Sequence, residues 1–72
     1  MTDLEFSRFG EFIQGQCGIK MPLAKKTMLQ GRLQKRLRVL GLDSFSVYAD
    51  YVFSTKGREE ELYQMIDAVT TN

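Results

Sequence analysis

The clearest structural signal lies in residues 22–41, which read PLAKKTMLQGRLQKRLRVLG. Within them, leucines recur every three or four residues and form one stripe: Leu29, Leu33, Leu37 and Leu40. Such spacing is typical of an amphipathic α-helix. Pro22 suits a first helical turn, where its missing N–H would have no partner, and Gly41 is a common residue just past a helix end. The pattern predicts a helix over residues 22–40.

A second apolar stripe precedes this helix. Its members are Leu4, Phe6, Phe9, Phe12, Ile13 and Cys17. Their spacing, mostly three or four residues, predicts a first helix that Thr2 or Asp3 caps and that Gly18 ends. Gly10 and Gly15 lie inside it, and each is either a kink or a point of close packing.

Two further helices are predicted after residue 41. Asp43 or Ser44 can cap a third helix, which ends near residues 55–57. Its apolar face is Phe45, Tyr48, Ala49 and Val52. A fourth helix is expected to begin with the glutamates of residues 59–61, which suit the positive end of a helix dipole. It buries Leu62, Met65, Ile66 and Val69. Because no segment shows strand alternation, the sequence predicts a compact all-α bundle of four short helices.

The composition is that of one small globular domain. The chain has 72 residues, of which 43% are hydrophobic and 26% charged, so it is not a disordered tail. No apolar run approaches the roughly 20 residues of a membrane helix, and the acidic, aromatic N-terminus is no signal peptide. We therefore expect a cytoplasmic protein with no membrane insertion.

Reactive side chains are few. The chain has one cysteine, Cys17, and no histidine. An internal disulfide, a Cys/His zinc site and a Ser-His or Cys-His nucleophile pair are therefore excluded within it. Because Cys17 falls on an apolar stripe, we expect a small buried hydrophobe rather than a reactive thiol. The composition argues against a self-contained hydrolase or metalloenzyme.

Charge is distributed unevenly along the chain. Between Glu11 and Asp43 there is no acidic residue, whereas the remainder is acidic, and the formal net charge is +1. The cations of this basic block are Lys20, Lys25, Lys26, Arg32, Lys35, Arg36 and Arg38. Such a block in an otherwise acidic domain indicates a surface for an anionic partner, whether nucleic acid, acidic lipid headgroups or an acidic protein helix.

The second helix gathers part of the basic block on one flank. At about 100° per residue, the cations that share this flank are Lys25, Arg32, Lys35 and Arg36. Lys26 and Arg38 lie outside it. Since Lys25 and Arg32 are two turns apart, the spacing suits an extended acidic partner such as a helix better than a single phosphate.

Two other interpretations of this flank stay open. In the first, the cations are solvated side chains whose intramolecular partners are the glutamates of the fourth helix. In the second, the helix, Gly41-Leu42 and the next helix form a DNA-binding helix-turn-helix. Against the second, the helix that would read DNA carries Asp50 and no cation.

Several residues together resemble a known family. They are Gly18-Ile19, Lys25, Met28-Leu29, Arg32-Leu33, Lys35-Arg36-Leu37-Arg38, Leu40-Gly41-Leu42, Phe45, Tyr48 and Thr70-Thr71-Asn72. In their order and spacing they resemble the amino-terminal all-helical domain of the CheR family of chemotaxis receptor methyltransferases. The resemblance covers nearly the whole chain, and its most specific parts are the Lys-x-x-Met-Leu-x-x-Arg-Leu block and the terminal Thr-Thr-Asn.

The resemblance implies a function that composition does not show. The family transfers a methyl group from S-adenosylmethionine to glutamate side chains on the cytoplasmic methylation helices of chemoreceptors. In the family the basic second helix contacts these acidic helices. The implied contact residues here are Lys25, Arg32, Lys35 and Arg38, with Arg36 beside them. The Asn of the Thr-Thr-Asn motif contacts the cofactor in the family, which corresponds to Asn72.

The resemblance also implies that a catalytic domain binding S-adenosylmethionine follows residue 72. Residues 1–72 are then one helical substrate-docking domain, which we expect to bind no cofactor and to be inactive alone. An alternative from another class is a stand-alone, non-enzymatic adaptor that binds an acidic protein or nucleic acid. The adaptor hypothesis predicts a reading frame that ends near Asn72.

Overall fold

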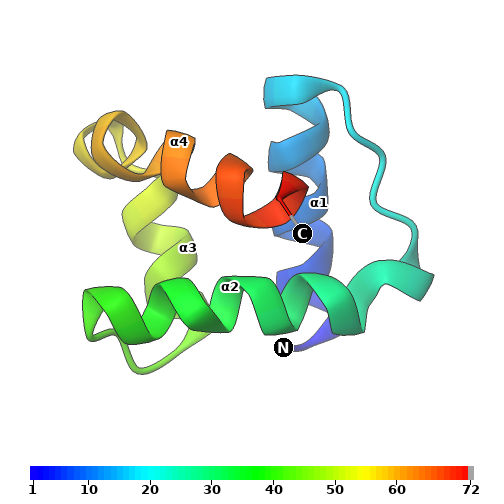
Figure 1. Cartoon of the computed structure of the whole chain (residues 1–72), viewed down its shortest axis with the longest axis horizontal. Helices are drawn as coiled ribbons and strands as arrows, with labels where there is room; N and C mark the ends of the chain where they lie inside the picture. Colours follow the sequence, from blue (N-terminus) through cyan, green and yellow to red (C-terminus); the bar gives the residue numbers. More distant parts are fainter. Residues whose placement is uncertain (72) are drawn as a thin grey trace.

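The computed structural model describes residues 1–71 and is built of helices (Figure 1). These are α1 (Asp3–Cys17), α2 (Lys26–Leu40), α3 (Phe45–Phe53) and α4 (Thr55–Thr70), with a 3-10 turn, η1 (Leu23–Lys25), before α2. Residues 1–71 contain no β-strand. The predicted all-α bundle of four short helices is confirmed. Within the same residues, no helix is both long enough and apolar enough to cross a membrane.

The four helices enclose a single core. In Figure 1, α1 and α3 stand upright, α2 crosses below them and α4 crosses between them. α3 packs against α1, α2 and α4, and α2 packs against α4. The ring of Phe9 lies at the centre, with its centroid 5.9 Å from that of Tyr48 and 5.7 Å from that of Phe53. The buried apolar residues are Phe6, Phe9, Ile13, Leu29, Leu33, Leu37, Tyr48, Ala49, Val52, Met65 and Val69.

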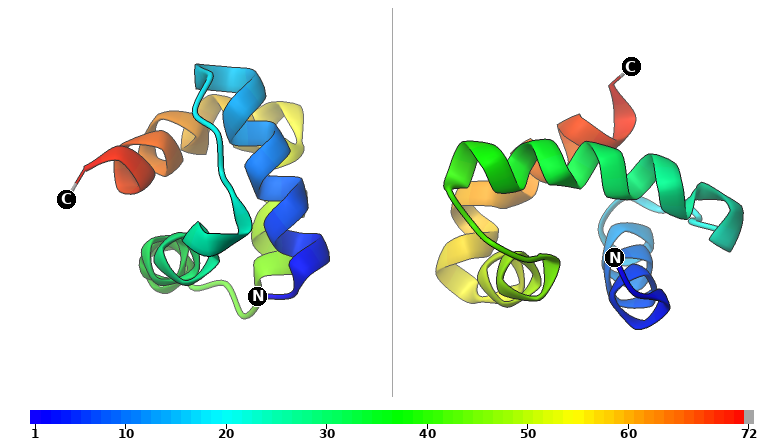
Figure 2. Two further views of the ribbon diagram at one scale, coloured as in Figure 1. Left: turned by 90° about the vertical axis from the view of Figure 1, so that its right-hand side faces the viewer. Right: turned by 90° about the horizontal axis from the view of Figure 1, so that it is seen from below.

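Helix α1 begins at a capping box and continues without a break. The Glu5 N–H donates to Thr2 Oγ1 (3.1 Å), and the Thr2 N–H donates to Glu5 Oε1 (2.7 Å), which satisfies two N–H groups at the helix start. Gly10 is a point of close packing, because a Cβ there would lie 3.4 Å from Met21 Cβ. Met21 belongs to the segment that runs back along α1 to the start of α2 (Figure 2).

Two members of the predicted α1 stripe are exposed. Leu4 is 73% exposed, and Cys17 is also exposed. The expectation of a buried Cys17 is therefore wrong. The reason is that the last turn of α1 extends beyond the helices that cover its middle (Figure 1). The Cys17 thiol donates to the Ile13 carbonyl oxygen of the same helix at 3.1 Å.

Helix α2 begins later and ends where the leucine pattern predicts. Pro22 has an extended ψ of 156° and precedes η1, so it does not open the α-helix. The first turn is 3-10 instead, as is frequent at helix starts. At the other end Gly41 has a φ of 70°. The Leu42 N–H donates to the Leu37 carbonyl oxygen at 2.9 Å, which completes a Schellman motif.

Helices α3 and α4 follow each other with only Ser54 between them. Ser44 caps α3 as predicted, since its Oγ accepts from the Val47 N–H at 3.2 Å. Ser54 ends α3 and caps α4. The prediction that the fourth helix begins at residues 59–61 is therefore wrong by one turn.

Gly57 explains this early start. It is not a stop but a residue of the first turn of α4, where its N–H donates to Ser54 Oγ at 3.0 Å. A Cβ at Gly57 would lie only 1.7 Å from the Tyr51 carbonyl oxygen. Glycine thus permits the close approach of the two helices, and the early start places Glu61 in the second turn, where it is buried.

Candidate functional site

The candidate site lies along α2. The leucine stripe faces the core, with Leu29, Leu33 and Leu37 at 0%, 0% and 6% exposure. Three of the five predicted contact residues, Lys25, Lys35 and Arg38, are exposed, and within residues 1–71 the side chains of these three make no hydrogen bond or ion pair. We call Lys25, Arg32, Lys35 and Arg38 the cationic face, of which the first three share the flank that helical periodicity defines and Arg38 lies beside it.

Lys26 holds the start of α2 against α1. Its Nζ lies 2.6 Å from Asp3 Oδ1 in an ion pair. The sequence placed Lys26 outside the cationic flank. Because this ion pair joins residues at the surface, its contribution to stability is at most about 1 kcal/mol.

Arg36 forms a largely buried ion pair with Glu61. Its Nε donates to Glu61 Oε2 and its Nη2 donates to Glu61 Oε1, both at 2.7 Å. The Tyr48 hydroxyl also donates to Glu61 Oε2 at 2.7 Å. The Glu61 side chain is 2% exposed and that of Arg36 is 18% exposed. The hydrogen bond with Glu61 raises the pKa of Arg36 above its ordinary value. For Arg36, a glutamate of the fourth helix is thus an intramolecular partner.

The sequence offered the glutamates of the fourth helix as intramolecular partners without singling out Glu61, and it missed Tyr48 as the second partner of that carboxylate. One signal was available: Glu61, Met65 and Val69 recur every four residues, which puts a glutamate on the buried stripe of α4. A carboxylate there needs a cation from another element, since an unpaired buried charge is strongly destabilising.

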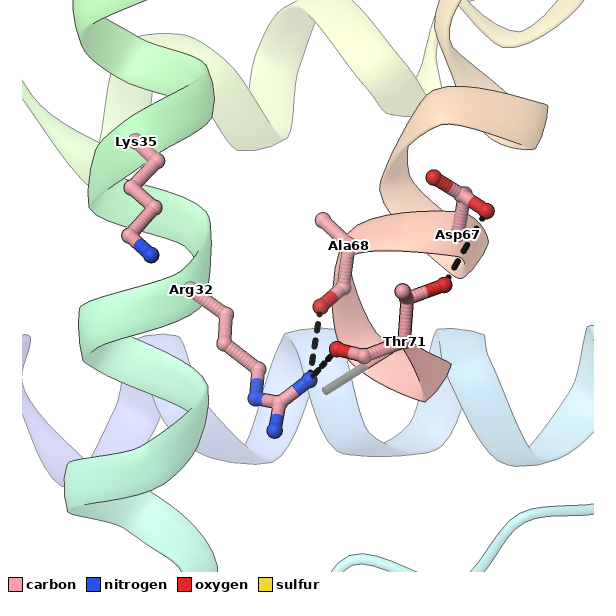
Figure 3. Close-up of a pocket in the computed structure, with 5 residues that line it drawn as sticks. All are labelled: Arg32, Lys35, Asp67, Ala68 and Thr71. Atoms are coloured by element: carbon pink, nitrogen blue, oxygen red, sulfur yellow. Dashed lines mark hydrogen bonds between the residues drawn. The ribbon is translucent and has the colours of Figure 1, made fainter.

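Arg32 contacts the end of α4. Its Nη1 donates to the carbonyl oxygens of Ala68 at 3.1 Å, Val69 at 3.3 Å and Thr71 (Figure 3). Arg32 and Lys35 on one side, and Asp67, Ala68 and Thr71 on the other, line an open cavity of about 330 Å³ between α2 and α4.

The pH dependence of stability should reveal the buried network. Burial, together with the hydrogen bond to Glu61, raises the pKa of Tyr48 above its ordinary 10.0. Below pH 10 its phenol is neutral in both states, and its stabilisation is fully present. As the pH rises from 10 toward the folded-state pKa, only the unfolded chain loses this proton. We expect this group to lower the free energy of unfolding by about 1.4 kcal/mol per pH unit in that range.

Urea denaturation at pH 9, 10 and 11 measures this effect. The Tyr48→Phe variant lacks the ionisable group and should show a shallower decline above pH 10. Tyr63 is 77% exposed, so Tyr63→Phe serves as the control and should keep the wild-type slope. Equal slopes for wild type and Tyr48→Phe would contradict the expectation.

The fold and the cationic face define a small all-helical domain with a candidate surface for anionic partners. Residues 4–70 match the family described as CheR methyltransferase, all-alpha domain. The chain belongs to this family.

Comparison with individual relatives extends this finding. Over its whole length the chain is 35% identical to a chemotaxis protein methyltransferase from Salmonella typhimurium and 33% identical to one from Escherichia coli. It is 29% identical to one from Borreliella burgdorferi. The chain spans about a quarter of the length of these relatives. No solved structure matches it.

Proposed function

We propose that this domain docks the acidic methylation helices of chemoreceptors for a methyltransferase of which it is part. The parent protein transfers a methyl group to glutamate side chains on those helices, and the domain alone is inactive. The observation that carries the proposal is the cationic face. The family and the names of the relatives support it.

The dimensions of the cationic face favour an extended partner. Lys25 and Arg38 are 13 positions apart, which corresponds to roughly 20 Å at the rise of an α-helix. A single phosphate spans little of this length, whereas an acidic helix lying along α2 can meet several of its cations. Attraction between exposed charges acts over about 8 Å at physiological salt. It therefore speeds encounter and gives an affinity that falls as salt is added.

The methyl transfer requires of this domain mainly that it dock the receptor helix. A glutamate carboxylate is already ionised at neutral pH, so it needs no general base, and its attack on a methyl donor depends on in-line positioning. In the parent, S-adenosylmethionine supplies the methyl group. We propose that Asn72 contacts this cofactor there. Asn72 lies outside the described residues, and residues 1–71 contribute the docking surface.

Two arginines of α2, Arg32 and Arg36, have partners within the domain, and their roles in this proposal differ. Because Glu61 accepts two hydrogen bonds from one edge of the Arg36 guanidinium, Arg36 anchors α2 to α4 and orients the face beside it. Direct contact with the receptor then falls to the cationic face. Lys35 and Arg38 are the most accessible test positions, since neither has an intramolecular partner among residues 1–71 to lose.

A titration monitored by amide chemical shifts tests the proposal. With a glutamate-rich receptor methylation-helix peptide, we expect shifts along residues 25–38 that weaken at higher salt. The Lys35→Ala/Arg38→Ala variant should bind on the order of fivefold to tenfold more weakly, because exposed pairs contribute up to about 1 kcal/mol each.

The control is Lys56→Ala, which removes an exposed cation from the start of α4. It should bind the peptide as wild type does. Equal weakening by the control would show that net charge, not the cationic face, drives binding. Tighter binding to an unrelated DNA duplex than to the peptide would favour the adaptor alternative.

A further inference from the structure

Helix α4 lacks the left-handed C-terminal glycine that ends α1 and α2. Those two helices stop at glycines with φ of 72° and 70°, whereas the residue after α4 is Thr71, with an extended backbone, and the last turn carries no basic residue. The last four carbonyl groups of any α-helix lack partners within the helix. At the end of α4 the Thr71 N–H donates to the Asp67 carbonyl oxygen, and the carbonyl groups after it need donors from elsewhere.

Arg32 supplies such donors from α2. Its Nη1 reaches carbonyl oxygens of Ala68, Val69 and Thr71, which are 36 to 39 positions away in the sequence. Val69 is buried beside this contact at 7% exposure. The guanidinium thus joins the middle of the cationic face to the last turn of α4.

We propose that Arg32 is a positioning residue that holds the last turn of α4 helical and fixes it against α2. It does so by donating to carbonyl groups of that turn, and this end of α4 lies away from α1 in the left view of Figure 2. The inference is independent of receptor docking, since it concerns contacts within the domain. It adds one consequence to the proposed function: a carboxylate that binds Arg32 competes with these carbonyls.

The length and the terminal donors of the arginine side chain are central to this role, because the contacts described above all come from its Nη1. A guanidinium presents several N–H donors in a planar array, whereas an ammonium is a compact point charge. Lys35 provides a natural comparison, because it lines the same cavity and carries the same charge, yet its side chain makes no hydrogen bond within residues 1–71.

The test compares Arg32→Ala, Arg32→Lys and Lys35→Ala with the wild-type chain, with no partner added. The first readout is the Cα secondary chemical shift of Ala68, Val69 and Thr70, recorded where each variant remains folded. The second is the distance between spin labels at Gln34→Cys and Thr70→Cys, in a Cys17→Ser background.

In Arg32→Ala we expect the helical shifts of residues 68–70 to fall by about half or more and the distance distribution to broaden, because the carbonyls lose their donor. Residues 55–65 should keep their helical shifts. Lys35→Ala should match wild type, and Arg32→Lys should fall between wild type and Arg32→Ala.

Two results would overturn the inference. If Arg32→Ala keeps the shifts and the distance, the turn does not depend on Arg32. If Lys35→Ala loses them to the same extent as Arg32→Ala, attraction between positive charge and the helix dipole holds the turn instead.

Discussion

The Arg36→Met variant is expected to lose about 3–5 kcal/mol of folding free energy, because it leaves the buried carboxylate of Glu61 without its cation. The Glu61 side chain is 2% exposed and would keep only the hydroxyl of Tyr48 as a partner. Per-residue averages give a domain of this length roughly 4–11 kcal/mol in total. At the lower end of that range the loss equals the whole stability, and a large part of the molecules would be unfolded at equilibrium.

Urea denaturation followed by circular dichroism measures this loss. The matched control is Lys35→Met, one position away on the same helix but exposed and without an ion pair in residues 1–71. It should change stability by no more than about 0.5 kcal/mol. Losses of similar size in both variants would refute the importance of the buried pair.

A double variant separates the pair from its uncompensated half. In Arg36→Met/Glu61→Leu both charges are replaced by apolar groups, so no buried charge is left alone. Because such replacements are often close to neutral, the double variant should be more stable than Arg36→Met. If it is less stable than the single variant, the loss in Arg36→Met has another cause, such as the packing of the methionine.

Gly57→Ala is the second substitution with a large expected effect. A Cβ at Gly57 would lie 1.7 Å from the Tyr51 carbonyl oxygen and 2.5 Å from its carbon. Backbone atoms cannot swing aside as a side chain does, so α3 and α4 must separate. We expect a loss on the order of 3 kcal/mol. Loosening of the contact between the two helices should also shift the melting temperature downward.

Gly31→Ala is the control for this substitution. Gly31 lies inside α2, and a Cβ there would meet no atom within 4 Å. Alanine favours a helix interior by roughly 0.5–1 kcal/mol over glycine, so Gly31→Ala should raise the melting temperature. A Gly57→Ala domain as stable as wild type would mean that α3 and α4 adjust without cost.

The local part of the fold follows from the sequence. Helix caps such as Thr2 and Ser44 act within three residues of themselves, and the leucine stripe of α2 repeats with the helical turn, so both can be read from a short window. Predictions failed where the outcome depends on packing against distant residues. Cys17 lies on an apolar stripe, but the helix extends beyond the core at that point and leaves Cys17 exposed. Gly57 accommodates the neighbouring helix rather than ending a helix.

The same distinction, between what is local in the sequence and what depends on distant packing, applies to the candidate site. The sequence by itself determined that a basic block lies on a helix, since charge and periodicity are local properties. Only the tertiary structure decided what each cation does. Arg36 pairs with a glutamate 25 positions away and Arg32 with carbonyls 36 to 39 positions away, whereas Lys25, Lys35 and Arg38 remain exposed. A helical wheel assigns a direction to each side chain, but the partner in that direction depends on which other helix the core brings there.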